Sequence, residues 1–316
     1  MNKKKKEISI HKQKFSFKLM YRQRYLLVMS VPFVIWLIIF KYIPLWGWTM
    51  AFQDVKPKTF ALSIWERTWV GFDHFKALLH DGEFFDALRN TLGISFIGIV
   101  LGFITSVGFA LLLNEVRLKR FKKVTQTISY LPHFVSWVII ASIAKMVLGD
   151  SGVLNEVLGK IGVGPIKFMT TNGPAFWLVV CIINIWKETG WDAIIYLSAM
   201  TGIDQGLYEA AKVDGAGRFR RMWHITLPGI RPTIIVLVIM SIGGVLGAGM
   251  ERQMLLGNGI VQDYADVVSW YAYRFGIGNN NYGFGTAVGV FQSAISLVLL
   301  FVANKVAGKF SDSKLV

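Results

Sequence analysis

Residues 203–228 read IDQGLYEAAKVDGAGRFRRMWHITLP and connect two long apolar segments. Asp204 is placed to cap a helix that begins at Gln205, because an aspartate oxygen accepts hydrogen bonds from the first free backbone N–H groups. We expect this helix to run to about Asp214, since Gly215 permits the sharp turn that ends a helix. Three- and four-residue spacing predicts a shared face for Leu207, Ala210, Ala211 and Asp214. A face of mostly small residues can press closely into a groove on a partner protein.

A second short helix is expected after Gly215, with Phe219 and Trp223 one turn apart and three arginines around them. We expect Pro228 and Pro232 to end it and to lead into the next apolar segment. The alternative is an amphipathic helix lying on a bilayer surface. The first helix carries too little bulky apolar area to favour that alternative.

The whole chain has the composition of a membrane protein. Its 316 residues are 53% hydrophobic, with a mean hydropathy of +0.48. Six apolar segments are long enough to cross a hydrocarbon layer about 30 Å thick. They lie near Leu26–Met50, Asn90–Leu113, Ile128–Leu148, Ala175–Met200, Thr233–Met250 and Gly285–Ala307. The sequence therefore predicts an all-α polytopic membrane protein with six transmembrane helices.

The positive charges indicate how these segments cross the membrane. Alternate connecting segments carry 22 Lys/Arg on one side and 9 on the other. The positive-inside rule then places both termini and residues 114–127 and 201–232 in the cytoplasm. A net charge of +15 follows this topology and forms no aromatic-interleaved face, so nucleic-acid binding is not expected.

The same pattern predicts five regions. They are a basic cytoplasmic segment at 1–25, a first transmembrane helix at 26–50, an external loop at 51–89, a five-helix permease core at 90–307 that includes the cytoplasmic loop 203–228, and a cytoplasmic tail at 308–316.

The spacing in the cytoplasmic loop resembles the EAA loop of binding-protein-dependent ABC importer permeases, which have a type I, MetI-like transmembrane fold. Glu209-Ala210-Ala211 is followed after three residues by Gly215 and, nine residues later, by Ile225-Thr226-Leu227-Pro228. The resemblance implies a coupling helix that seats on an ATPase subunit, with Glu209 pairing with a basic residue there. The coupling residues that it implies are Leu207, Tyr208, Glu209, Ala210, Ala211, Asp214, Gly215, Ile225, Leu227 and Pro228.

The resemblance also implies a set of partners in a bacterial cytoplasmic membrane. They are a second related permease chain, two copies of a cytoplasmic ABC ATPase that uses ATP and Mg, and an extracytoplasmic solute-binding (lipo)protein. The chain itself is expected to bind no cofactor, and it has no Gly-rich phosphate-binding loop ending in Lys-Ser/Thr.

Other strings resemble the carbohydrate-uptake branch of the family, and within it the LplB-like polysaccharide-type permeases. They are Gly71 to Lys76, Ala87 to Thr91, Tyr130 to Trp137 and Ile185 to Lys187. One departure is Gln205, where that family often has proline. The resemblance implies an oligosaccharide cargo.

The fourth apolar segment contains charges, which are costly in a membrane unless they face a cavity or each other. Asn184, Glu188 and Asp192 recur at four-residue steps and share a face, while Lys187 and Trp191 form a neighbouring stripe. Together with Trp186, these residues are candidates for a sugar pathway, because carboxylates and amides hydrogen-bond sugar hydroxyls and indoles stack on sugar rings. An internal Lys187–Glu188 or interhelical ion pair that only fixes packing is the alternative. Thr189-Gly190 is expected to loosen this helix.

Two further features leave alternatives open. The last external loop, from Glu251 to Phe284, is rich in Tyr, Trp and Asn, and would contact the binding protein, line the outer mouth or fold onto the bundle. The five histidines are scattered and predict no metal site, and Cys181 is expected to be a packed thiol.

The rival functions are a permease for peptides, phosphate or metal complexes, and a polytopic membrane enzyme or receptor that uses the carboxylates of the fourth segment. The enzyme or receptor predicts activity without any ATPase partner.

Overall fold

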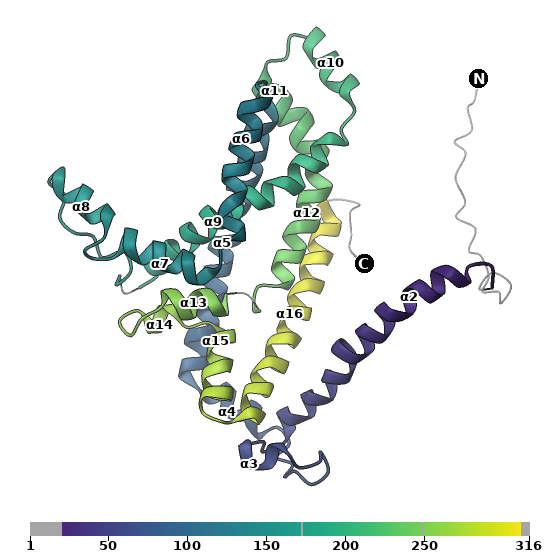
Figure 1. The fold of residues 1–316 in the computed structure, drawn as a ribbon, viewed down its shortest axis with the longest axis vertical. Coiled ribbons are helices and arrows are strands. Elements are labelled where there is room, and N and C mark those ends of the chain that lie inside the picture. The colour runs from purple at the N-terminus through teal and green to yellow at the C-terminus, as the bar shows by residue number, and fades with distance from the viewer. Residues whose placement is uncertain (1–20, 172, 248, 311–316) are drawn as a thin grey trace. The chain divides into compact units, whose positions relative to one another are not determined.

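The computed structural model describes residues 21–171, 173–247 and 249–310 (Figure 1). Most of the basic segment predicted at 1–25 and most of the tail predicted at 308–316 lie outside the described residues. Within the described ranges every regular element is helical, with one isolated antiparallel bridge between Gln53 and Trp69. The prediction of an all-α protein is therefore confirmed.

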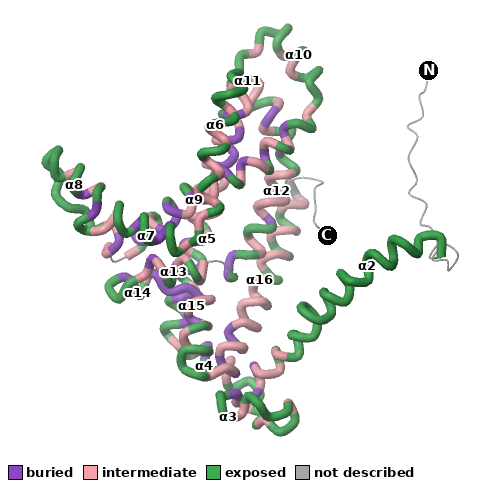
Figure 2. Tube along the Cα trace, in the orientation of Figure 1, coloured by how far each residue is buried: buried purple, intermediate pink, exposed green. Residues whose placement is uncertain are grey.

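The chain divides into two compact units, residues 1–49 and residues 50–316, and the first contains most of the first predicted span. Residues 24–52 form consecutive helical turns, made of α2 (Arg24–Leu37), the π-helical η1 (Ile38–Tyr42) and the 3-10 helix η2 (Ile43–Phe52). This run is long and apolar enough to cross a membrane and includes the predicted span. Figure 2 shows that α2 is exposed, and none of its residues is buried. The apolar composition of α2 suits the hydrocarbon interior of a membrane.

The second unit begins with two short helices and one very long one. These are α3 (Pro57–Phe60), α4 (Asp73–His80) and the 34-residue α5 (Gly82–Glu115). Asp81 caps α5 by accepting the backbone N–H of Glu83 at 2.9 Å. The predicted span Asn90–Leu113 lies inside α5, which packs along α9 (Ala175–Thr201).

The third predicted span, Ile128–Leu148, is wrong as a single helix. The chain instead forms α6 (Lys119–Tyr130), the 3-10 turn η3 (Leu131–Phe134), α7 (Trp137–Leu148) and α8 (Val153–Lys160). Pro132 has no backbone N–H, and Val135 after it is extended. Ser136 then starts α7 by accepting the N–H of Ile139. The apolar run hides this break because it continues through the proline.

The fourth predicted span matches α9 to within one residue at its end. Within the described ranges, length and composition mark five helical runs as able to cross a membrane, at 24–52, 82–115, 137–160, 218–243 and 282–308. α9 has the length of a sixth but carries Lys187, Glu188 and Asp192. Gly190 does not loosen it, because α9 is continuous through that residue.

The fifth predicted span, Thr233–Met250, is wrong at both ends. One run of helix extends through α11 (Arg218–Arg221), the π-helical η4 (Met222–Thr226) and α12 (Leu227–Gly243), and turns follow at Gly244. Pro228 and Pro232 do not end it. Pro228 is in the first turn of α12, directly after the π-helical turn, where the regular hydrogen-bond ladder is already interrupted. Pro232 is accommodated inside α12.

The carboxy-terminal part is helical throughout most of its described length. It contains α13 (Met250–Leu256), α14 (Gln262–Ala265), α15 (Val268–Tyr273), the π-helical η5 (Arg274–Gly278) and α16 (Tyr282–Phe310). The predicted span Gly285–Ala307 lies inside α16, which runs beside α12 (Figure 1).

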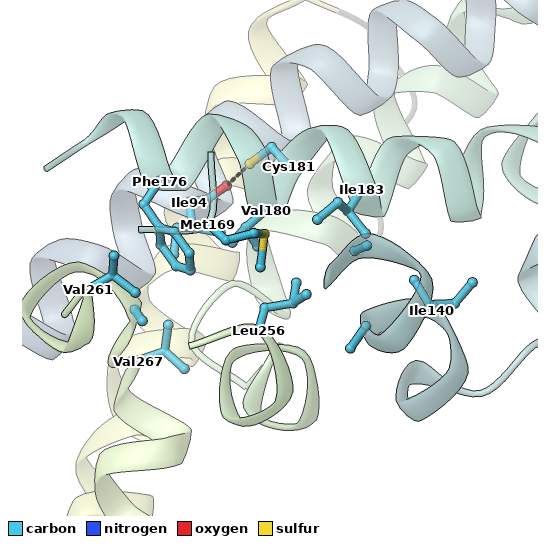
Figure 3. Close-up of a cluster of buried hydrophobic side chains, with 13 residues drawn as sticks. Ile94, Ile140, Met169, Phe176, Val180, Cys181, Ile183, Leu256, Val261 and Val267 are labelled. Carbon is cyan, nitrogen blue, oxygen red and sulfur yellow. Dashed lines mark hydrogen bonds between the residues drawn. The ribbon is translucent and has the colours of Figure 1, made fainter. Parts of the chain in front are cut away.

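The largest buried apolar cluster joins α5, α7 and α9 to the segment after α12. Phe176, Val180 and Ile183 of α9 point toward Leu256, Val261 and Ile140 in Figure 3. Cys181 lies at the edge of this cluster, where its Sγ contacts the carbonyl oxygen of Ile94 at 3.4 Å. The prediction of a packed thiol is confirmed, because Cys181 is a buried free cysteine.

Candidate functional site

A cavity of about 400 Å³ lies between α5, α9, α12 and the start of α13. Small-molecule sites in proteins usually have volumes of about 300–1,000 Å³ and a few convergent polar groups. The polar groups here are Ser95, Ser106, Asn184, Glu188, Thr189, Asp192, Tyr196, Ser241 and Arg252. A larger hollow of about 730 Å³, near Met50 and Tyr282, has no charged lining. The smaller cavity is therefore the candidate site.

The predicted face of α9 opens onto this cavity. Asn184, Glu188 and Asp192 all line it, as their four-residue spacing predicts. Lys187 does not, because its side chain is only 4% exposed and turns toward η3. Trp186 is exposed on another side of the helix, and Trp191 is also outside the lining. The structure thus places three of the six predicted pathway residues at one site.

Glu188 belongs to a charged cluster as well as to the cavity wall. Its Oε1 lies 3.2 Å from Nζ of Lys187, and its Oε2 accepts a hydrogen bond from Nδ1 of His133 at 2.6 Å. Nζ of Lys187 also donates to the backbone carbonyl of His133 at 2.6 Å. The predicted Lys187–Glu188 ion pair is therefore present, and Glu188 also faces the cavity, so its role in a sugar pathway stays a prediction.

His133 is the residue through which this cluster joins two helical elements. It lies in η3, at the break between α6 and α7, and its ring stacks on Trp191 with centroids 4.3 Å apart and planes 1° apart. The side chain of Lys187 is almost fully buried in this cluster, whereas those of Glu188 and His133 are partly exposed. The cluster therefore holds the broken third segment against α9.

Two residues of the site lie outside the sequence prediction. His133 was part of a family-like string, but nothing local indicates that it contacts Glu188, 55 positions away. Arg252 falls in the predicted external loop, yet it lines the cavity and donates from Nη1 to Oδ1 of Asn184 at 2.7 Å. The sequence feature that could have indicated Arg252 is its position just after the glycine-rich end of the fifth segment.

The predicted cytoplasmic helix is α10 (Gln205–Val213). Asp204 caps it, accepting the backbone N–H of Gly206 at 2.9 Å, and Gly215 has a φ of 77°, the left-handed conformation that glycine adopts most easily. The hydroxyl groups of Tyr208 and Thr226 lie 2.9 Å apart and connect α10 to η4. Glu209 makes no ion pair with Lys212 within the described part of the chain, so its carboxylate is available to a partner.

The surface of this loop is open and partly apolar. Leu207 and Ala210 are exposed and Ala211 is partly exposed, as are Ile225 and Leu227, while Asp214 and Pro228 are exposed. Val213, Phe219 and Trp223 have 89%, 80% and 68% of their surfaces exposed. Large exposed apolar side chains next to small ones are typical of a protein interaction surface.

The segment predicted to be the last external loop folds onto α5. Asn90, fully buried, donates from Nδ2 to the carbonyls of Asp263 and Asp266, both at 2.9 Å. The hydroxyl of Tyr271 bonds to Asp81, and Arg274 pairs with Asp266. Burial raises the pKa of the Asp266 carboxyl, although Arg274 acts in the opposite direction. Among the three predicted alternatives, this geometry matches packing on the bundle.

No group of three or more His, Cys, Asp or Glu side chains among the described residues could hold a metal ion.

Comparison with known proteins gives a consistent result. Residues 98–312 match the family model described as binding-protein-dependent transport system inner membrane component. The chain is 43% identical to protein LplB of Bacillus subtilis (strain 168), covering 93% of this chain and 92% of that one. It is also 43% identical to the polygalacturonan/rhamnogalacturonan transport system permease protein YteP of the same organism, covering 92% and 90%.

A solved structure also resembles this chain. It is the crystal structure of a bacterial alginate ABC transporter in complex with alginate pentasaccharide-bound periplasmic protein, with a TM-score of 0.84 and 38% identity. The match covers 94% of this chain and 99% of that chain. The MetI-like fold expected from the cytoplasmic loop is therefore confirmed.

Proposed function

The chain belongs to the family of binding-protein-dependent transport system inner membrane components, and we propose that it forms one half of the membrane pathway of an ATP-driven oligosaccharide importer. The observation that carries the proposal is the cavity between α5, α9 and α12, in which Asn184, Glu188 and Asp192 face one space. Carboxylate and amide oxygens accept hydrogen bonds from hydroxyl groups, which are the main polar groups of a sugar. The sugar systems named for the relatives support the same class of cargo.

The cytoplasmic loop is proposed to receive the work of ATP hydrolysis from separate ATPase subunits. Its small-residue face, the free carboxylate of Glu209 and the exposed Phe219 and Trp223 fit a docking surface. The helical run Arg218–Gly243 begins in this loop and ends at the cavity wall, where Leu237 and Ser241 line the space. Movement of the loop would reach the cavity along one continuous element.

The proposed assembly contains a second related permease chain, two ATPase copies and an extracytoplasmic binding protein. The relative crystallised with a ligand-bound periplasmic protein supports that last partner. Both termini are proposed to be cytoplasmic, on the basis of the Lys/Arg distribution.

The test is sugar-stimulated ATPase activity of the reconstituted complex with its binding protein, across an oligosaccharide panel. Glu188→Ala and Asp192→Ala should reduce stimulation by sugar more than they reduce the unstimulated rate. Glu209→Ala should abolish uptake while the chain still inserts and assembles. Stimulation by no sugar in the panel would refute the oligosaccharide assignment, and normal uptake by Glu209→Ala would refute the coupling assignment.

A further inference from the structure

Arg252 is a cation at one end of the cavity. It belongs to α13 and lines the space together with Asn184, to which its Nη1 donates at 2.7 Å. Its Cζ lies 5.8 Å from the ring centroid of Trp137. A Cβ added at Gly249 would come within 3.0 Å of its Nη2, so the guanidinium packs closely on that backbone. These contacts hold the side chain in place.

None of these contacts neutralises its charge. A guanidinium stays protonated in proteins and offers five N–H donors, of which Asn184 takes one. Among the described residues Arg252 makes no ion pair, and its buried Nε has no hydrogen-bond partner. Arg252 is partly exposed where it lines the cavity, so its unused N–H donors can bind an anion there.

The two carboxylates of the cavity do not supply that anion. Glu188 is already engaged by Lys187 at 3.2 Å and by His133 at 2.6 Å. Asp192 is eight residues along α9 from Asn184, which is about 12 Å at 1.5 Å per residue. The Asn184 end of the cavity is thus cationic, and the Asp192 end is acidic. A ligand that matches both ends carries an anionic group at one end and hydroxyl donors toward the other.

We propose that Arg252 binds the carboxylate of an acidic sugar, so that the cavity selects uronate-containing oligosaccharides over neutral ones. This inference rests on the proposed function and specifies its substrate class. Guanidinium and carboxylate groups form bidentate, charge-assisted hydrogen bonds, which exceed neutral ones in strength about twofold. Hydroxyl groups of the same sugar, or of its neighbour, donate to Asp192.

The experiment uses the complete complex in proteoliposomes with its binding protein. The probes are oligosaccharides of galacturonate, mannuronate and guluronate, each paired with its methyl ester, which has nearly the same shape but no charge. Uptake and ATPase stimulation are measured for each acid and its ester, and the ratio of the two is the readout. The unchanged complex should prefer at least one acid over its ester. Equal rates for every pair, or transport of esters alone, would overturn the inference while leaving an oligosaccharide importer. No uptake of any probe or of neutral oligosaccharides would overturn the proposed function itself.

Variants then locate the preference. Arg252→Gln should lower the acid-to-ester ratio by about tenfold to hundredfold, which is the size expected for a hydrogen-bonded charge. Arg89→Gln is the matched control, because Arg89 is a half-exposed guanidinium that pairs with Asp86 and does not line the cavity. It should keep the ratio of the unchanged complex. An unchanged ratio in Arg252→Gln, or equal losses for acid and ester, would assign Arg252 to packing instead.

If the Arg252→Gln variant does not assemble, a more conservative variant tests the same inference. Arg252→Lys retains the charge but loses the planar fork. It should reduce uptake of the acid several-fold and leave uptake of the ester unchanged. Equal reductions for both probes would overturn the inference.

Discussion

Replacing Gly190 by alanine tests how closely α6 and α9 must approach each other. Gly190 is buried, and a Cβ built on it would lie 2.0 Å from the carbonyl oxygen of Ser129 and 2.4 Å from its carbonyl carbon. Contacts under 3.0 Å essentially never occur for a real Cβ. The two helix backbones would therefore have to separate by about 1 Å, because a backbone carbonyl cannot rotate away as a side chain can.

The separation has both an energetic and a structural consequence. Overpacking costs about 1–3 kcal/mol, and the backbone clash places Gly190→Ala near the upper end of that range. The better helix propensity of alanine offsets about 1 kcal/mol, which leaves a net loss of about 2 kcal/mol. If η3 moves with α6, the 2.6 Å bonds from His133 to Lys187 and Glu188 lengthen beyond hydrogen-bond distance. The cluster beside the cavity would then come apart.

The assay is thermal unfolding of the purified complex, followed by sugar-stimulated ATPase activity after reconstitution. Gly190→Ala should lower the Tm by several degrees and reduce stimulation. Gly289→Ala in α16 is the control, because a Cβ there meets nothing within 4 Å. An unchanged Tm together with full stimulation in Gly190→Ala would refute the reasoning.

Three further substitutions probe other contacts. Tyr208→Phe should cost about 1 kcal/mol by removing the bond to the buried Thr226, and should speed hydrogen exchange in α10; unaltered exchange would contradict this role. Gly215→Ala should destabilise the turn after α10 by about 1–2 kcal/mol and lower ATP-dependent uptake; unchanged uptake would contradict this. Asn90→Ala should lower the unfolding free energy by about 1–3 kcal/mol, because the buried carbonyl of Asp266 loses this donor, while that of Asp263 keeps the one from Arg89; equal thermal stability in denaturation scans would argue against it.

The features that the sequence predicted well depend on neighbouring residues. The helix after Asp204 and the turn at Gly215 follow from the cap and from glycine, both within a dozen positions. The shared face of Asn184, Glu188 and Asp192 follows from helical periodicity alone. Apolar length was enough to find the first, second, fourth and sixth spans.

The features that the sequence did not predict depend on residues far apart in the chain or on a local irregularity of the backbone. The contact between His133 and Glu188 and the entry of Arg252 into the cavity are set by tertiary packing, which no spacing encodes. The apolar pattern also continues through Pro132 and past Gly243, so it predicted helices that are broken or too long there. Hydropathy reports which residues tolerate lipid and not where the backbone stays helical.

The π-helical turn η4 (Met222–Thr226) lies within the run Arg218–Gly243, between α11 and the cavity. Such a turn holds one more residue than an α-helical turn, and each α-helical residue rotates the chain by about 100° around the axis. The turn therefore sets the angular phase between Phe219 at one end and Ser241 at the other. Converting it to a regular turn would swing Ser241 by roughly a quarter of a revolution, away from the cavity it lines, without moving the loop.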